Sequence, residues 1–309
     1  MKVLRYSIIV SLVSLLLAGA WSCKSNKQKE EEPPDSPYGG RIYVSADESF
    51  KPIIDEHVKV YEANRPGTEI VVNYKPEAEC LKDMIVDSVR MIIATRGYSE
   101  NERNFIVDSF RIAPKRMVVA RDAVAVIVNP GAEDSLFSMD EIRQILTGKF
   151  KKELIPVFDG VQATSTVRFI VDSVLKTEPI TPRAVAARSS EGVIDYVSKN
   201  PNTIGFIGVS WIGNREDVQQ VSFLKKVKMA HLESTDMPGM YVLPVQANIY
   251  LRRYPMIRDL VYILKENHRG LGKGFADFLS GERGQLIFKR AYLMPAQKDF
   301  RVRPVRLRE

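Results

Sequence analysis

Cysteine and histidine are scarce in this chain of 309 residues, which has two cysteines and three histidines. Cys23 lies at the end of a signal-like segment, so Cys80 has no internal partner and a disulfide framework is excluded. The histidines, His57, His231 and His268, stand far apart, and none has the spacing of a metal site with another histidine or a cysteine. We therefore expect no metal, no cofactor and no enzymatic activity.

Glycine and proline are also few in number, and the excess of positive charge is small. The 18 glycines and 17 prolines are too few for a collagen-like or low-complexity chain. The formal net charge is +7, and two of its cations, Lys2 and Arg5, lie in a segment that we expect to be removed. Such a modest excess suits small anions and gives no reason to expect nucleic acid. A length near 300 residues accommodates one large or two ordinary domains with a full core.

Only one long hydrophobic run stands near the N-terminus, at residues 8–17, after Lys2 and Arg5. The run is too short for a membrane span and is followed by small residues at 18–20, so it predicts an export signal over residues 1–22.

Cys23 directly follows this signal, an arrangement that resembles the lipobox of bacterial lipoproteins. The resemblance implies that the Cys23 thiol is acylated; an incidental cysteine after ordinary signal cleavage is the alternative. The charged, proline-bearing residues 23–40 predict a flexible tether. The expected product is an extracytoplasmic, membrane-anchored lipoprotein, facing the periplasm in a cell with an outer membrane.

The body of the chain alternates short β-branched runs with segments of helical periodicity, which predicts an α/β fold. Sequences typical of capping boxes occur at residues 45–48, 99–102 and 138–141. The expected strands lie at residues 41–44, 69–74, 91–94 and 203–208. The expected helices lie near residues 50–61, 79–88, 99–110, 138–146, 167–175, 193–197, 257–264 and 271–278.

Two long segments, at residues 117–128 and 241–250, are expected to be extended, and they bracket a middle block. This organisation predicts one domain inserted into another, with two crossovers forming a hinge. The expected first lobe comprises residues 41–122 and 245–309, and the inserted second lobe comprises residues 123–244.

Four stretches together resemble the substrate-binding proteins of phosphate ABC transporters, the PstS-like branch of the type II periplasmic binding proteins. These stretches are residues 43–50, 92–96, 163–166 and 275–285. The resemblance covers most of the body, from about Arg41 to Ala296. It implies two lobes joined by paired hinge strands that close on an oxyanion between them.

The polar residues of these stretches suit an oxyanion. Thr164, Ser165 and Thr166 precede a predicted helix, whose first backbone N–H groups lack partners and favour negative charge. Arg168 lies in the first turn, where a cation opposes the helix dipole, so we expect it to face a ligand. The alternative is that Thr164 or Ser165 only caps the helix.

Two further pairs complete the candidate site. Thr95 and Arg96 end a buried strand, and ligands of open α/β sheets lie beyond the carboxyl ends of strands. The alternative for Arg96 is a surface ion pair with Glu100 or Glu102. Ser49 and the amide of Phe50 lie at the first turn of the first helix and match the family's anion loop; their alternative role is also capping.

Two departures from the family pattern leave selectivity against sulfate open. The family's Ser-Ser-Gly loop is replaced by residues 76–79, and Arg96 stands where part of the family places an acceptor aspartate. An acceptor for the proton of hydrogen phosphate would come from one of four acids, Asp47, Glu48, Glu77 and Glu79. For Glu77 and Glu79 we expect solvent-exposed side chains at a helix start.

The sequence therefore predicts a monomeric, lipid-anchored protein that binds phosphate between two lobes and delivers it to an ABC permease. One alternative is an oxyanion sensor, or a binding-protein-like lipoprotein with an altered ligand and no transport role. A periplasmic hydrolase is an alternative of a different class.

Overall fold

The computed structural model describes residues 35–111, 113–160 and 164–297. The predicted signal peptide (1–22), Cys23, most of the predicted tether and Ala163 lie outside these residues. No helix in the described part of the chain is long and apolar enough to cross a membrane.

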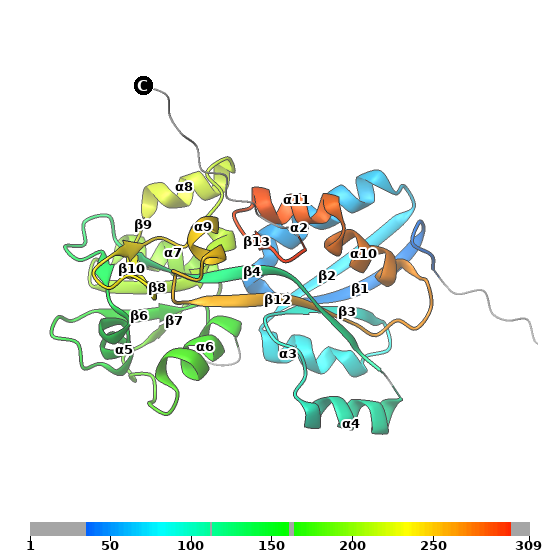
Figure 1. Cartoon of the computed structure of the whole chain (residues 1–309), viewed down its shortest axis with the longest axis horizontal. Helices are drawn as coiled ribbons and strands as arrows, with labels where there is room; N and C mark the ends of the chain where they lie inside the picture. The colour runs from blue at the N-terminus through cyan, green and yellow to red at the C-terminus, as the bar shows by residue number, and fades with distance from the viewer. Residues whose placement is uncertain (1–34, 112, 161–163, 298–309) are drawn as a thin grey trace, which may run out of the picture. The chain divides into compact units, whose positions relative to one another are not determined.

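The N-terminal part of the fold is a sheet built from buried apolar strands. β1 runs parallel to β2 on one side and to β3 on the other, and β12 continues the sheet antiparallel to β3. Figure 1 shows α2, α10 and α11 on one face of this sheet and α3 and α4 on the other. The strands are β1 (Gly40–Asp47), β2 (Thr68–Lys75), β3 (Val89–Ala94) and β12 (Ile257–Leu264). The helices are α2 (Lys51–Asn64), α3 (Glu77–Lys82), α4 (Glu100–Phe110), α10 (Leu271–Ser280) and α11 (Glu282–Arg290), with 3₁₀ turns at Glu48–Phe50 and Asp83–Ile85.

One long strand, β4 (Lys115–Val128), belongs to two sets of strands. Its first part pairs with β12, from Lys115 opposite Leu264 to Ala123 opposite Ile257. Its last part, from Val124, pairs with β8 (Thr203–Gly208). The strand order is therefore β2-β1-β3-β12-β4-β8-β6-β7, and β4 is the extended segment that the sequence predicted at residues 117–128.

The second set of strands continues from β8 to β6 and β7, which pair in parallel. A separate three-stranded sheet has the order β11-β10-β5. The strands are β5 (Leu136–Phe137), β6 (Ile155–Phe158), β7 (Val185–Ala186), β9 (Lys228–Met229), β10 (His231–Glu233), β11 (Tyr241–Val242) and β13 (Met294–Pro295). The helices are α5 (Met139–Thr147), α6 (Ser165–Phe169) with a π-helical continuation at Ile170–Leu175, α7 (Ser190–Lys199), α8 (Val218–Lys226) and α9 (Gln246–Tyr250), with a 3₁₀ turn at Val209–Trp211.

Two predicted elements are wrong. Residues 257–264 form strand β12, not a helix, because five consecutive buried residues from Leu260 make a two-sided central strand that also satisfies a helical spacing. The segment 241–250 is extended only at Tyr241–Val242, and its end is helix α9.

The capping boxes have two outcomes. Those at Ser99 and Ser138 are confirmed, with both reciprocal hydrogen bonds formed. The one at Ser45 is wrong: Ser45 lies inside β1, and Asp47 accepts the Ser49 N–H at 2.9 Å instead.

Candidate functional site

A buried polar cluster lies where β1, β4 and β12 meet the starts of α6 and α7. We call it the inner cluster, and its members are Asp47, Ser49, Asp122, Asp159, Ser165, Thr166, Ser190 and Arg258. Arg258 is its centre: Nε donates to Asp122 Oδ2 at 2.8 Å, and Nη1 donates to Ser165 Oγ at 2.9 Å and Thr166 Oγ1 at 3.4 Å. The guanidinium lies over the ring of Phe50, 5.1 Å from its centroid. A Cβ at Gly208 would come within 3.0 Å of Arg258 Nη2, so glycine permits this close approach.

Hydroxyl groups from distant parts of the sequence lie around Ser165 and Asp159, next to this arginine. Ser49 Oγ lies 3.3 Å from Ser165 Oγ, although the two residues are 116 positions apart. Ser49 Oγ and Ser190 Oγ both approach Asp159 Oδ2, at 3.4 and 3.3 Å, and Ser190 Oγ also donates to Glu48 Oε2 at 3.0 Å. The structure thus brings together three predicted site residues, Ser49, Ser165 and Thr166, with Phe50 beneath the arginine.

Several polar atoms of the inner cluster have no partner. Among the described residues, Asp47 Oδ2, Asp122 Oδ1, Asp159 Oδ1 and Arg258 Nη2 are buried without a hydrogen bond. Burying such groups costs free energy unless they are paired. The cluster therefore contains one buried donor and three buried acceptors whose hydrogen-bonding capacity is unused.

Burial also shifts the acidity of this cluster. Desolvation raises the pKa of Asp47 to about 6, against the opposing charge of Arg258. Desolvation and the neighbouring Asp159 raise the pKa of Glu48 to about 7. Asp122 and Asp159 also have a pKa raised by burial, with Arg258 acting in the opposite direction. The cluster can therefore hold both carboxylates and protonated carboxyl groups near neutral pH.

A second polar group, which we call the Glu77 bridge, consists of Glu77, Thr95 and Arg168. Glu77 Oε1 accepts from Thr95 N at 2.7 Å and from Thr95 Oγ1 at 2.5 Å, and Glu77 Oε2 accepts from Arg168 Nε at 2.5 Å. Arg168 Nη2 donates to Thr95 Oγ1 at 2.6 Å. The predicted site residues Thr95 and Arg168 thus lie together, but they face a glutamate side chain.

The expectation that Glu77 faces solvent is wrong, because its side chain is 2% exposed. Pro76 positions Glu77 as the first residue of α3, beside the end of β3 where the Thr95 amide has no strand partner. Glu79 is exposed, which confirms the expectation for this residue.

The remaining predicted site residues lie in other roles. Arg96 forms a two-pronged ion pair with Glu102 at 2.9 and 3.1 Å, which is the alternative that the sequence left open. Thr164 accepts the Val167 N–H at 3.2 Å and caps α6, also as its alternative proposed. Neither residue contacts Arg258 or Glu77 in the described structure.

Sequence reasoning missed Arg258, Asp122, Asp159 and Ser190. The available signal was a charged residue inside each of two apolar segments. Once residues 257–264 are assigned to strand β12, Arg258 lies directly opposite Asp122 of the neighbouring strand β4. Assigning that segment to a helix removed this signal.

One further group could hold a metal ion among the described residues. His268 Nε2 lies 3.0 Å from Asp35 Oδ1 and 3.8 Å from Glu266 Oε1, and both carboxylates are buried. The carboxylates also accept the backbone amides of Leu271, Gly272 and Lys273. They therefore serve as caps of α10, a helix whose own N-cap is a glycine.

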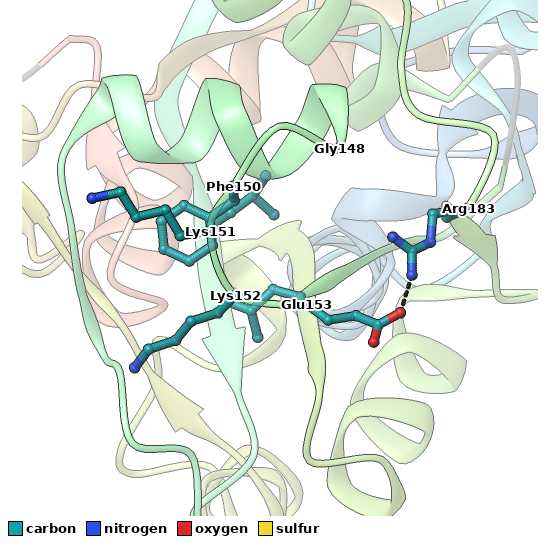
Figure 2. A pocket seen from close by; sticks show the side chains of 8 residues that line it. Gly148, Phe150, Lys151, Lys152, Glu153 and Arg183 are labelled. Carbon is teal, nitrogen blue, oxygen red and sulfur yellow. Dashed lines mark hydrogen bonds and ion pairs between the residues drawn. The ribbon is translucent and has the colours of Figure 1, made fainter.

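Cavities in the described structure lie outside the inner cluster, and two of them can be compared with the predicted site. Figure 2 shows one of about 230 Å³ beside the end of α5, whose Arg183 pairs with Glu153 and whose Lys152 pairs with Asp134. It contains none of the predicted site residues. A second cavity, of about 270 Å³, is lined by Glu77 and Arg168, so it adjoins the Glu77 bridge. Arg96 also lines it, so two predicted site residues, Arg96 and Arg168, face the same cavity.

Comparison with known proteins is consistent with this architecture. Residues 30–283 match the model of the PBP superfamily domain. The chain is 23% identical over 293 residues to the phosphate-binding protein PstS of Bacillus subtilis, covering 89% of this chain and 88% of that protein.

Solved structures show the same two-lobed α/β fold. One is a phosphate ABC transporter substrate-binding protein with bound phosphate from Clostridium perfringens, with a TM-score of 0.69 and 20% identity over 83% of this chain and all of that one. Another is an ABC-type phosphate transport receptor from Vibrio cholerae, with a TM-score of 0.60 and 17% identity over 82% of this chain and 99% of that one.

Proposed function

The chain belongs to the PBP superfamily, and we propose that it binds phosphate between its two lobes. The observation that carries this proposal is Arg258, a buried arginine with a free Nη2 beside the hydroxyls of Ser165 and Thr166. A guanidinium and hydroxyl groups donate charge-assisted hydrogen bonds to oxyanions. The phosphate-binding relatives support the choice of this anion.

The free acceptors favour phosphate over sulfate. Hydrogen phosphate carries a P–OH that can donate to Asp47 Oδ2 or Asp159 Oδ1, both of which are buried without a partner. Sulfate has no proton to give at neutral pH, so the same carboxylates would repel it and stay unpaired. Asp47 is one of the four acids that the sequence offered for this role, and Asp159 is an additional candidate from the structure.

Donors come from both proposed lobes, Ser49 from the first and Ser165 from the second. A ligand held by both stabilises the closed arrangement through contacts that an open arrangement lacks. Binding by lobe closure is therefore the mechanism that we propose, with no covalent step.

Titration calorimetry with phosphate, then sulfate, tests the proposal on the full chain. We expect phosphate to bind and sulfate to bind far more weakly. Ser165→Ala should weaken phosphate binding by about 1–3 kcal/mol, since it loses a hydrogen bond to a charged group. Ser198→Ala, whose hydroxyl bonds to its own helix, is the control. Absence of heat and of thermal stabilisation at millimolar phosphate would remove phosphate as the ligand.

We also propose that Cys23 is acylated and that the protein works outside the cytoplasm, delivering phosphate to an ABC permease. The signal-like residues 1–22 and the transport relatives support this role. Cys23→Ala should move the protein from the membrane fraction to the soluble fraction. A variant that stays with membranes would exclude the acyl chain as its anchor.

A second candidate function is a lipoprotein of the same fold with an altered ligand and no transport role. Glu77 favours it, because this carboxylate takes donors that an oxyanion would need. Competition titrations with sulfate, arsenate and molybdate separate the two functions: a preference for another oxyanion would select this second one.

A further inference from the structure

We infer that the carboxylate of Glu77 is an internal anion that occupies the outer part of the binding site, so that an incoming oxyanion gains Thr95 and Arg168 only by displacing it. The inference rests on the proposed function, since it concerns regulation of the same site.

The donors around Glu77 are those that an oxyanion would use. Two oxygens of one carboxylate accept a backbone amide, a hydroxyl and a guanidinium, from Thr95 N, Thr95 Oγ1 and Arg168 Nε, at 2.7, 2.5 and 2.5 Å. Charge-assisted bonds of this kind hold phosphate as well as carboxylate. Glu77 therefore stands in for two oxygens of a bound anion.

Glu77 is charged despite its burial. Desolvation acts to raise its pKa, but the hydrogen bonds from Arg168 and Thr95 outweigh this effect and hold the pKa below its ordinary value. A charged carboxylate that is 2% exposed and fully paired is costly to remove from its partners. A ligand must therefore offer these donors at least an equal set of contacts.

The bridge also joins two separate parts of the fold. Glu77 and Thr95 belong to α3 and to the end of β3, whereas Arg168 belongs to α6 and is 91 residues from Glu77. An ion pair between the two lobes stabilises their approach in the absence of a ligand. The bridge thus favours a ligand-free closed form in which Thr95 and Arg168 are already occupied, and this competing form lowers the apparent affinity for the anion.

The bridge and the inner cluster are electrostatically coupled. The negative charge of Glu77 contributes to the raised pKa of Asp47. Removing this charge makes the neighbouring site less negative and frees Arg168 Nε of its carboxylate partner, while Nη1 stays paired with Asp172 at 3.2 Å. Both effects favour an anion, so loss of the Glu77 charge should strengthen phosphate binding.

Glu77→Gln and the matched control Glu79→Gln, two residues along the same helix, test the inference in the full chain. We expect Glu77→Gln to bind phosphate about tenfold more tightly than wild type in titration calorimetry, a change of about 1.4 kcal/mol. Glu79→Gln should bind as wild type does. In ligand-free protein, hydrogen exchange at residues 77–82 and 165–175 should become faster in Glu77→Gln only, because α3 and α6 lose the ion pair between Glu77 and Arg168.

Each readout has an outcome that overturns the inference. Equal or weaker phosphate binding by Glu77→Gln would show that Glu77 does not compete with the anion. Unchanged exchange in Glu77→Gln would show that the ion pair does not hold the two segments together. If neither wild type nor Glu77→Gln binds phosphate at millimolar concentration, the proposed function fails. Hydrogen exchange in the ligand-free proteins would then still show whether the Glu77–Arg168 ion pair holds the two segments together. Thermal melting of each variant, together with Glu77→Asp, which is too short to reach all three donors, separates these results from misfolding.

Discussion

The inner cluster and the Glu77 bridge are two polar groups at the same junction of the fold, and they treat charge in opposite ways. The inner cluster has three carboxylates around one arginine and leaves four buried polar atoms unpaired. The bridge has one carboxylate whose two oxygens are both bonded. The first group leaves hydrogen-bonding capacity unused, whereas in the second the carboxylate itself uses the donors. In the proposed function the inner cluster can therefore bind an anion directly, whereas the bridge can do so only after Glu77 is displaced.

The strongest test of this difference is the removal of Arg258. Arg258→Met leaves Asp47, Asp122 and Asp159 without their shared buried cation, so the free energy of unfolding should fall by about 3–5 kcal/mol at neutral pH in urea denaturation. Arg121→Met is the control: its pair with Asp259 is exposed and long at 3.6 Å, so the loss should stay below about 1 kcal/mol. Equal losses would mean that the inner carboxyl groups do not depend on the arginine.

The next largest effect should be on the pH dependence of stability, to which the inner cluster and the Glu77 bridge contribute differently. The pKa of Asp47 is raised by burial to about 6, so the folded protein holds a proton that the unfolded chain releases at lower pH. This contribution to stability is present at low pH and is lost as pH rises from about 4 to about 6, by up to about 3 kcal/mol.

Asp47→Asn should therefore make this decline shallower, which thermal melting between pH 4 and pH 7 measures against wild type. The share that comes from Glu48, whose pKa is raised to about 7, should remain. Asp55→Asn, at an exposed residue paired with Lys51, should leave the decline unchanged. Glu102, whose pKa is lowered to about 2 by Arg96, acts in the opposite direction at lower pH and is common to all variants. A decline as steep in Asp47→Asn as in wild type would assign it to other groups.

The smallest effects on stability should come from substitutions of Arg168 and Arg96, which the sequence predicted to bind phosphate in the same way. Arg168→Gln leaves the buried Glu77 with Thr95 alone and should cost about 1–2 kcal/mol in unfolding free energy. Arg96→Gln breaks an ion pair with Glu102, a partly exposed partner, and should cost about 0.5 kcal/mol or less. Arg96→Gln should also leave phosphate binding within about twofold of wild type, a change of less than 0.5 kcal/mol. A large loss of binding in this variant would place Arg96 in the site.

What the sequence predicted well depends on local rules. The boxes at Ser99 and Ser138 need only residues three positions apart, and both form. The strand at residues 203–208 is bounded by turn residues and is found at those bounds. For the site, the approach of Ser49 to Ser165 followed from the family resemblance and not from any local pattern.

What the sequence missed depends on distant partners or on ambiguous periodicity. An acidic residue at a helix start is usually solvated, and nothing near Glu77 reveals that Arg168 lies beside it in space. Arg258 was assigned to a helix because a continuous apolar run fits either period. Both misses concern side chains whose burial is set by tertiary packing.

The shared strand β4 has a consequence for how binding moves the molecule. Its neighbour changes from β12 to β8 between Ala123 and Val124, directly after Asp122. Asp122 is the residue that holds Arg258, at 2.8 Å. In the proposed mode of binding, a phosphate that contacts this guanidinium therefore acts within one residue of the point where β4 passes from one set of strands to the other.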